Sequence, residues 1–115
     1  MRPDVPSDPS IQHLETNRGP VAFSVEGRGP VILALHGCPG SIRDFRWLAP
    51  VLSKAFTVIR LDLPGFGQTP IRVAPSPKLS ERALFVASVV RQLGIKKSCI
   101  IGHSAGGAVA MELAA

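Results

Sequence analysis

Short apolar runs separated by turns rich in glycine and proline dominate the pattern of this chain. Residues 31–35, 56–61 and 98–101 are largely apolar and lack the alternation of a strand that has one face in water. Such runs are typical of strands buried on both faces, as in parallel sheets covered by helices. We therefore predict three buried strands in these segments.

Segments with helical periodicity follow the first two of these strands. After residues 31–35, Ser41 is a favourable N-cap for a helix of about a dozen residues, and Asp44 suits its first turn. Pro50 is expected to bend this helix or end it early. The predicted apolar stripe consists of Phe45, Leu48, Val51 and Leu52.

A second helix is predicted over residues 80–93. Ser80 is its expected N-cap, Leu79 can pack on Leu84 as a hydrophobic staple, and Gly94 suits the position just after the end. Residues 68–79 contain three prolines and are expected to be irregular.

The N-terminal part of the chain predicts an antiparallel hairpin. Residues 11–16 and 21–25 are strand candidates separated by a turn, and residues 1–10, with three prolines, are expected to be a disordered leader. The order is then strand–helix, strand–helix, strand–helix. This order predicts an α/β fold in which residues 11–115 contribute to one domain, with a mostly parallel sheet, the hairpin and helices on both faces.

Composition and charge exclude several classes of function for these 115 residues. The net charge of +5 comes from thirteen basic residues scattered along the chain, so a nucleic-acid surface is not expected. No apolar run approaches the ~20 residues of a membrane span. Two cysteines do not form a disulfide framework, which favours a cytoplasmic protein. Neither metal-ligand spacing nor a nucleotide-binding glycine motif occurs, so no metal and no cofactor is expected.

The candidate chemistry lies where the last apolar run meets a helix-favouring segment. Here the sequence reads Gly102-His103-Ser104-Ala105-Gly106, a Gly-x-Ser-x-Gly pattern. A serine exposed at such a turn needs a strained backbone, and the glycines keep side chains out of the crowded contact between strand and helix. The N–H groups that begin the helix favour an anion nearby. We therefore predict that Ser104 is a nucleophile.

Three stretches together resemble the N-terminal part of proteins with the α/β-hydrolase fold. Residues 36–40 resemble the family's His-Gly loop, residues 62–67 its Asp-x-x-Gly-x-Gly loop, and residues 102–107 its nucleophile elbow. The resemblance implies a serine hydrolase that acts on a small-molecule ester or related acyl substrate. A carbon–carbon bond hydrolase of the same fold stays open. Serine at the elbow sets aside the family's dehalogenases and epoxide hydrolases that use an Asp nucleophile.

The resemblance also implies roles for the neighbouring residues. The oxyanion hole would consist of the backbone N–H groups of Ala105 and Cys38, with Gly40 as the alternative, because Pro39 has no N–H. Asp62 would shape its loop, and Trp47 and Phe66 could line a pocket or pack in the core. The other residues expected to shape the site are His36, Gly37, Gly40, Gly102, His103 and Gly106.

The family's remaining catalytic groups are not found after Ser104. In the family the acid and then the histidine follow the serine, whereas residues 105–115 contain neither Asp nor His. His13, His36 and His103 are poor candidates for the base. The sequence therefore resembles a family member truncated after the elbow strand, and a non-catalytic fragment is the second hypothesis. In that case residues 98–101 would form an unpaired apolar sheet edge. The substrate and the oligomeric state stay open.

Overall fold

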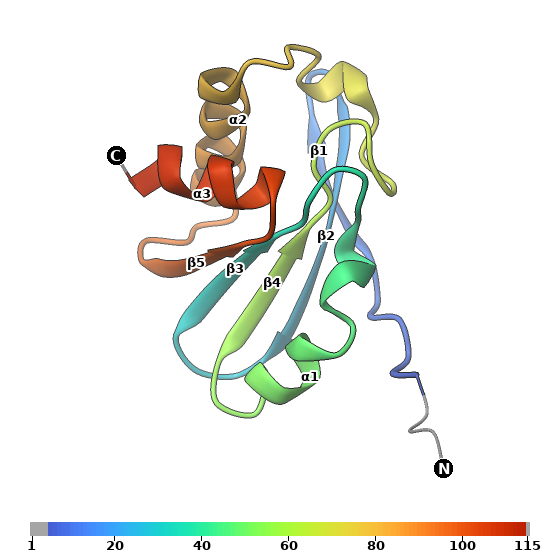
Figure 1. Ribbon diagram of the computed structural model, residues 1–115, viewed down its shortest axis with the longest axis vertical. Coiled ribbons are helices and arrows are strands. Elements are labelled where there is room, and N and C mark those ends of the chain that lie inside the picture. The colour runs from blue at the N-terminus through green and yellow to red at the C-terminus, as the bar shows by residue number, and fades with distance from the viewer. Residues whose placement is uncertain (1–4, 115) are drawn as a thin grey trace.

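The computed structural model describes residues 5–114, and a five-stranded mixed sheet lies at its centre (Figure 1). The strands are β1 (Gln12–Thr16), β2 (Gly19–Gly27), β3 (Val31–Leu35), β4 (Thr57–Leu61) and β5 (Ser98–Gly102). The helices are α1 (Leu48–Leu52), α2 (Leu79–Gln92) and α3 (Ala105–Ala114), with two short 3₁₀ helices, η1 (Ile42–Phe45) and η2 (Ile71–Val73).

The sheet has the strand order β1-β2-β4-β3-β5. Strand β3 pairs in parallel with both β4 and β5, whereas β1 and β2 form the antiparallel hairpin. The predicted α/β fold with an N-terminal hairpin is therefore confirmed. The parallel part is confined to β3, β4 and β5, because β2 pairs with β4 in the antiparallel sense.

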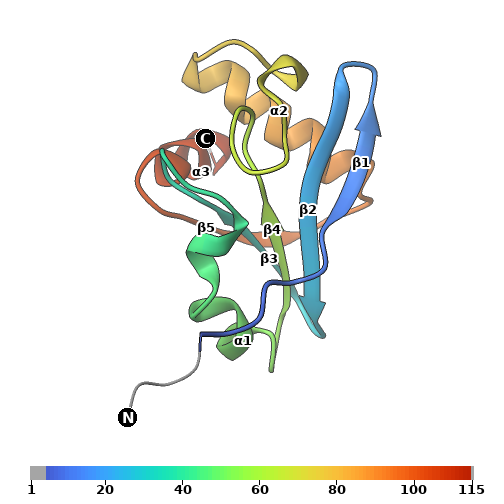
Figure 2. The same ribbon diagram turned by 90° about the vertical axis from the view of Figure 1, so that its right-hand side faces the viewer.

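Both faces of the sheet are covered. Leu33 and Leu35 of β3 face a large apolar cluster with α2 and α3, while Ala34 faces a smaller cluster with η1 and α1. Figure 1 shows α2 and α3 on one side of the sheet and α1 on the other, and Figure 2 shows the same layers after a quarter turn. Burial on both faces explains why β3 and β4 are apolar without alternation.

The helix predicted after Ser41 is split into η1 and α1. Ser41 is the predicted N-cap, with its Oγ accepting the Arg43 N–H at 3.1 Å. Pro50 lies in the first turn of α1, where a missing N–H costs no helical hydrogen bond, so it does not end the helix. The predicted apolar stripe is wrong at Leu48 and Val51, which are 47% and 60% exposed.

The residues that face the core are still spaced as on one helix. Phe45 of η1, Ala49 of α1 and Leu52 follow one another at i, i+4 and i+7. The prediction chose the larger side chains Leu48 and Val51 beside this stripe and passed over the small side chain of Ala49.

The predicted start of α2 is also wrong. The helix begins at Leu79 with Lys78 as its N-cap and without a side-chain capping bond, so Ser80 is not the cap. Leu79 and Leu84 are 42% and 64% exposed, because α2 docks through Ala83, Val86 and Val89 instead, and the staple is not formed. At the other end Gly94 has φ +76°, as predicted for the position after the helix.

The N-terminal segment before β1 is irregular and contacts η1 through one ion pair. Residues 5–11 form no helix or strand, and Asp8 accepts a hydrogen bond from Arg43 Nε at 3.0 Å. The rest of the predicted leader, residues 1–4, lies outside the described residues.

Strand β5 is the last strand of the sheet, and within residues 5–114 its outer edge has no strand partner, as expected. Ile100 and Ile101 are half-buried there.

A buried cation connects the hairpin to the region that follows β3. Arg60 of β4 is 2% exposed, forms an ion pair with Glu26 of β2, and donates from Nη1 to Ile42 O at 3.3 Å. Removal of one charge from such a pair leaves the other charge buried without compensation.

We predict that Glu26→Gln lowers the free energy of unfolding by about 2 kcal/mol or more, because Arg60 loses its carboxylate partner. The matched control is Asp8→Asn, which breaks the exposed ion pair to Arg43 and should cost less than about 0.5 kcal/mol. Urea unfolding followed by circular dichroism measures both. Equal effects of the two substitutions would contradict the assigned role of Arg60.

Candidate active site

Ser104 occupies a sharp turn between β5 and α3. Among the described residues it is the only non-glycine with positive φ, at +55°, and it belongs to neither element. Its side chain is exposed. The left-handed conformation costs roughly 1–2 kcal/mol for a residue with a Cβ, so the surrounding contacts must hold the serine in place.

Backbone hydrogen bonds help to keep Ser104 in this conformation. The N–H of His103 donates to Leu35 O at 3.1 Å and joins the turn to the end of β3. The Gly106 N–H donates to His103 O at 3.0 Å, and the Ala108 N–H donates to Ser104 O at 3.2 Å. The serine is therefore fixed from the strand side and from the helix side.

The glycines on both sides of Ser104 stand where no side chain fits. A Cβ on Gly102 would lie 2.6 Å from the Gly107 nitrogen, and a Cβ on Gly106 would overlap the carbonyl oxygens of Leu35 and His36. These neighbours are backbone atoms, which cannot rotate away. The first turn of α3 is thus in direct backbone contact with the ends of β3 and β5.

The loop after β3 reaches the serine from the other side. A Cβ placed on Gly37 would lie 3.2 Å from Ser104 Cβ, and one on Gly40 would lie 2.6 Å from Gly37 O. The Cys38–Pro39 peptide bond is cis. The loop is therefore tightly folded against Ser104, with Cys38 exposed next to it.

Cys38 and Ala105, the predicted oxyanion donors, line the same cleft of about 310 Å³. Ser104 lies beside this cleft, because Gly37 and Ala105 both border it. Ala105 is the first residue of α3, where an N–H has no acceptor within the helix and the helix dipole favours negative charge. The apolar lining consists of Leu63, Phe66, Pro77, Leu79, Ala108 and Val109.

His36 holds two loops together. Its ring is fully buried, and Nε2 accepts the N–H of Leu63 at 2.9 Å. The ring proton is therefore on Nδ1, which donates to Gly37 O at 2.7 Å. The edge of the ring packs against Phe66, with the ring centres 5.5 Å apart. Both nitrogens are engaged, which favours the loop-shaping role over that of a base.

Asp62 connects the same loops through backbone donors. Its Oδ1 accepts the N–H of Ile42 at 2.8 Å and its Oδ2 accepts the N–H of Gln68 at 2.9 Å. Gly67, with φ +54°, passes so close that a Cβ would overlap the Asp62 carboxylate. The carboxylate is 3% exposed and has no histidine partner in the described part of the chain.

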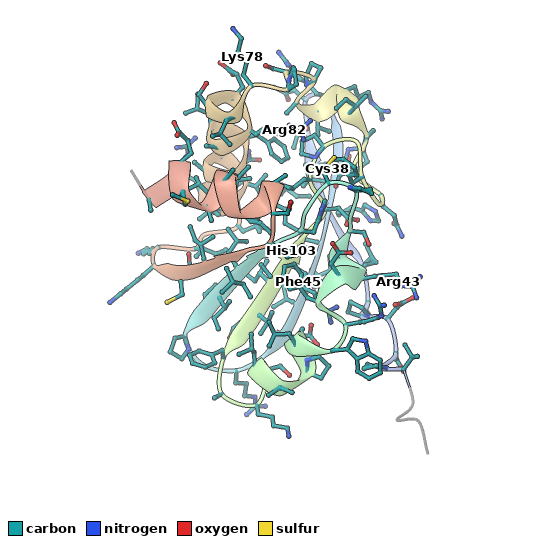
Figure 3. All side chains as sticks on the ribbon, viewed as in Figure 1. Cys38, Arg43, Phe45, Lys78, Arg82 and His103 are labelled. Carbon is teal, nitrogen blue, oxygen red and sulfur yellow. The ribbon has the colours of Figure 1, made fainter. Side chains whose placement is uncertain are left out.

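The other two histidines have different surroundings. His103 lines a hollow of about 610 Å³ with Phe45 and Ile101, and Figure 3 shows it near Phe45. Its Nδ1 also lies beside Gly37, 3.2 Å from the position of a Cβ there. His13 on β1 has its Nε2 3.1 Å from Gln68 Oε1. Within residues 5–114 no histidine is hydrogen-bonded to Ser104 Oγ. The candidate pocket residue Trp47 is 48% exposed and does not line the cleft, whereas Phe66 does.

Arg82 is a cleft residue that the sequence reasoning did not select. It contributes the one charged side chain among the residues that line this cleft, and Figure 3 labels it on α2. A signal was present in the sequence, because Arg82 continues the helical stripe of Val86 and Val89 on α2 and of Leu93 just after it. This stripe is the side of the helix that packs against the protein.

The described residues contain no cluster of three or more His, Cys, Asp or Glu side chains arranged to hold a metal ion. None of the helices in residues 5–114 has the length and apolarity needed to cross a membrane.

Comparison with known proteins identifies the architecture. The family described as alpha/beta hydrolase fold matches residues 30–115. The acetyltransferase component (dihydrolipoyllysine-residue) of an acetoin cleaving system from Cupriavidus necator is 39% identical over 95 residues, which cover 82% of this chain and 25% of that protein. A soluble epoxide hydrolase from Corynebacterium is 38% identical over 92 residues, covering 80% of this chain and 32% of its own length.

A solved structure of an N-acyl homoserine lactonase in complex with N-hexanoyl homoserine lactone superposes with a TM-score of 0.79. It is 32% identical and covers 90% of this chain and 40% of the lactonase. The chain therefore spans between a quarter and two-fifths of the length of these three proteins.

We predict that Gly106→Ala destabilises the fold by about 2–3 kcal/mol, because the new Cβ would overlap backbone carbonyl oxygens. Gly107→Ala is the matched control, since a Cβ there has its nearest contact at 3.4 Å. It should be neutral or stabilise α3 by up to about 1 kcal/mol. Urea midpoints give both values, and similar midpoints for the two variants would show that the turn is not tightly packed.

Proposed function

This chain belongs to the alpha/beta hydrolase fold family, and we propose that it carries the nucleophile and oxyanion hole of a serine hydrolase. The substrate would be an ester or a related acyl compound. The observation that carries the proposal is the strained turn at Ser104, φ +55°, beside a cleft that Ala105 and Cys38 share.

In the proposed reaction Ser104 Oγ attacks the carbonyl carbon of the substrate. The carbonyl oxygen becomes an oxyanion that accepts hydrogen bonds from the N–H groups of Ala105 and Cys38. Collapse of this intermediate breaks the bond to the leaving alcohol and leaves the acyl group on Oγ. Water then attacks the acyl-enzyme, releases the acid and restores the serine hydroxyl.

The serine needs a base to take its proton. His36 has both ring nitrogens engaged, and neither His13 nor His103 is hydrogen-bonded to Ser104 Oγ in the described residues. We place the base and its acid outside this chain, as the order of catalytic residues in the family suggests.

The comparisons support a hydrolase in general, but they do not identify which chemical bond is hydrolysed. That choice rests on the chemistry of the serine. One relative is named an epoxide hydrolase, and one similar structure is named a lactonase, whose ligand contains a cyclic ester. A serine hydroxyl at the elbow suits acyl transfer, because the ester it forms is readily hydrolysed by water. Ester hydrolysis is therefore the function that we assign to Ser104.

A non-catalytic role is the competing hypothesis for this chain. The outer edge of β5, the strand that leads to Ser104, has no strand partner within residues 5–114. An unpaired apolar edge is an aggregation hazard, which favours a chain that does not act as an enzyme by itself. The two hypotheses differ in whether the hydroxyl reacts selectively.

We predict that a fluorophosphonate probe modifies Ser104 selectively, because its phosphonyl oxygen can accept the two proposed N–H donors. The reaction should be slow without a base next to Oγ, so long incubation and peptide mass spectrometry are needed. Ser104→Ala should abolish the modification. Ser80→Ala, which removes an exposed hydroxyl from α2, should leave it unchanged.

Absence of labelling in protein with an intact circular dichroism spectrum would favour the non-catalytic role. Equal labelling of several serines, or the same labelling after denaturation in urea, would also contradict the proposal, because selectivity must come from the folded turn.

We further predict that Cys38→Ala leaves the rate of this modification within about twofold of the original, because the proposed donor is the backbone N–H and not the thiol. The measurement is the time course of labelling at Ser104. A thiol that acted as the nucleophile would instead carry the probe itself, and the alanine variant would then lose labelling.

A further inference from the structure

Arg82 is a cation without a carboxylate partner in the described part of the chain. The ion pairs recorded among residues 5–114 are Arg43–Asp8 and Arg60–Glu26, and Arg82 belongs to neither. Its side chain is half-buried, and Nη1 donates to Pro64 O at 3.1 Å. A guanidinium has five N–H donors, so most of its hydrogen-bonding capacity is free.

Arg82 lies in mostly apolar surroundings, where N–H donors without an acceptor are costly. The cleft that it lines, about 310 Å³, is otherwise bordered by apolar side chains and by the backbone around Gly37, Cys38 and Ala105. Partial removal of a cation from water is costly unless an anion or hydrogen-bond acceptors replace the water. The acceptor recorded for Arg82 is a single neutral carbonyl.

Arg82 is also connected to the loops that carry the proposed oxyanion hole. It is bonded to Pro64, and the preceding residue Leu63 donates its N–H to His36, which in turn leads into Gly37 and Cys38. The guanidinium and the candidate oxyanion donors are thus held by one hydrogen-bonded unit. Figure 3 shows Arg82 on α2 and Cys38 on the loop after β3, and both line the same cleft.

We propose that Arg82 determines specificity by binding a carboxylate of the substrate, whose reacting carbonyl lies at the oxyanion end of the cleft. The substrate class is then a short acyl ester with a second, ionised carboxyl group, such as the half-ester of a dicarboxylic acid. A carboxylate fits the planar fork of the guanidinium with two hydrogen bonds. One cation in an apolar cleft matches a single negative charge better than a phosphate dianion. The assignment of this ligand as a substrate rests on the function proposed above, but its binding does not.

The test compares monomethyl glutarate with dimethyl glutarate, which lacks the charge. Both are titrated by NMR into the ¹⁵N-labelled 115-residue chain carrying Ser104→Ala, so that no turnover occurs. We expect the half-ester to bind about tenfold or more tightly than the diester, as for a hydrogen-bonded charged group. In Arg82→Gln this preference should disappear.

The matched control is Arg91→Gln. It removes the same charge from an exposed position of the same helix. This variant should still bind the half-ester more tightly than the diester. If the preference came only from the net charge of the protein, Arg91→Gln would weaken it as well. A second readout needs no substitution at Arg82. Its side-chain Nε–H resonance should shift with the half-ester and not with the diester, which keeps the test decisive if Arg82→Gln does not fold.

Equal affinity for the two esters, or a preference that survives Arg82→Gln, would overturn the proposal. Its outcome is separable from that of the proposed function. Selective labelling of Ser104 without a carboxylate preference would remove only the role of Arg82. A carboxylate preference without labelling would keep the anion site and remove the serine hydrolase.

Discussion

The structure around Ser104 depends on a contact between backbone and backbone. The first turn of α3 packs against the carbonyl oxygens of Leu35 and His36 so closely that Gly106 has no room for a Cβ. This contact lies in the first turn of the helix, directly after Ser104, whose φ is +55°. In the proposed function, N–H groups of that turn without an acceptor in the helix are available to an oxyanion. Because rigid backbone makes the contact, a side chain cannot adapt to relieve it.

A small set of buried polar groups extends this arrangement into the neighbouring loops. His36 joins the loop after β3 to Leu63, and Asp62 accepts N–H groups from Ile42 and Gln68. Arg60 approaches Ile42 from the sheet and is neutralised by Glu26. Loop backbone groups that are buried need such partners, so these side chains stabilise an otherwise irregular region. None of them has to take part in chemistry for the site to depend on them.

In the proposed function, backbone groups stabilise the oxyanion, whereas side chains determine which substrates bind. The proposed oxyanion donors at Cys38 and Ala105 are main-chain groups and can serve many acyl substrates. Discrimination must then come from the side chains that line the cleft, where Arg82 contributes a charge among apolar neighbours. A charge in such surroundings favours substrates that carry the opposite charge, because a neutral substrate would leave it unpaired at a cost in binding free energy.

The sequence alone determined the features that depend on near neighbours in the chain. The apolar runs located β3, β4 and β5, the glycine spacing located the turn at Ser104, and Gly94 located the end of α2. Its errors at Leu48 and Leu84 arose where burial depends on how a helix docks, which periodicity within one segment cannot supply. Only the tertiary structure decided the cleft, because Cys38, Phe66, Arg82 and Ala105 come from four separate segments. Their proximity follows from the parallel order of β4, β3 and β5 and from packing across the sheet, and those long-range contacts have no local signature.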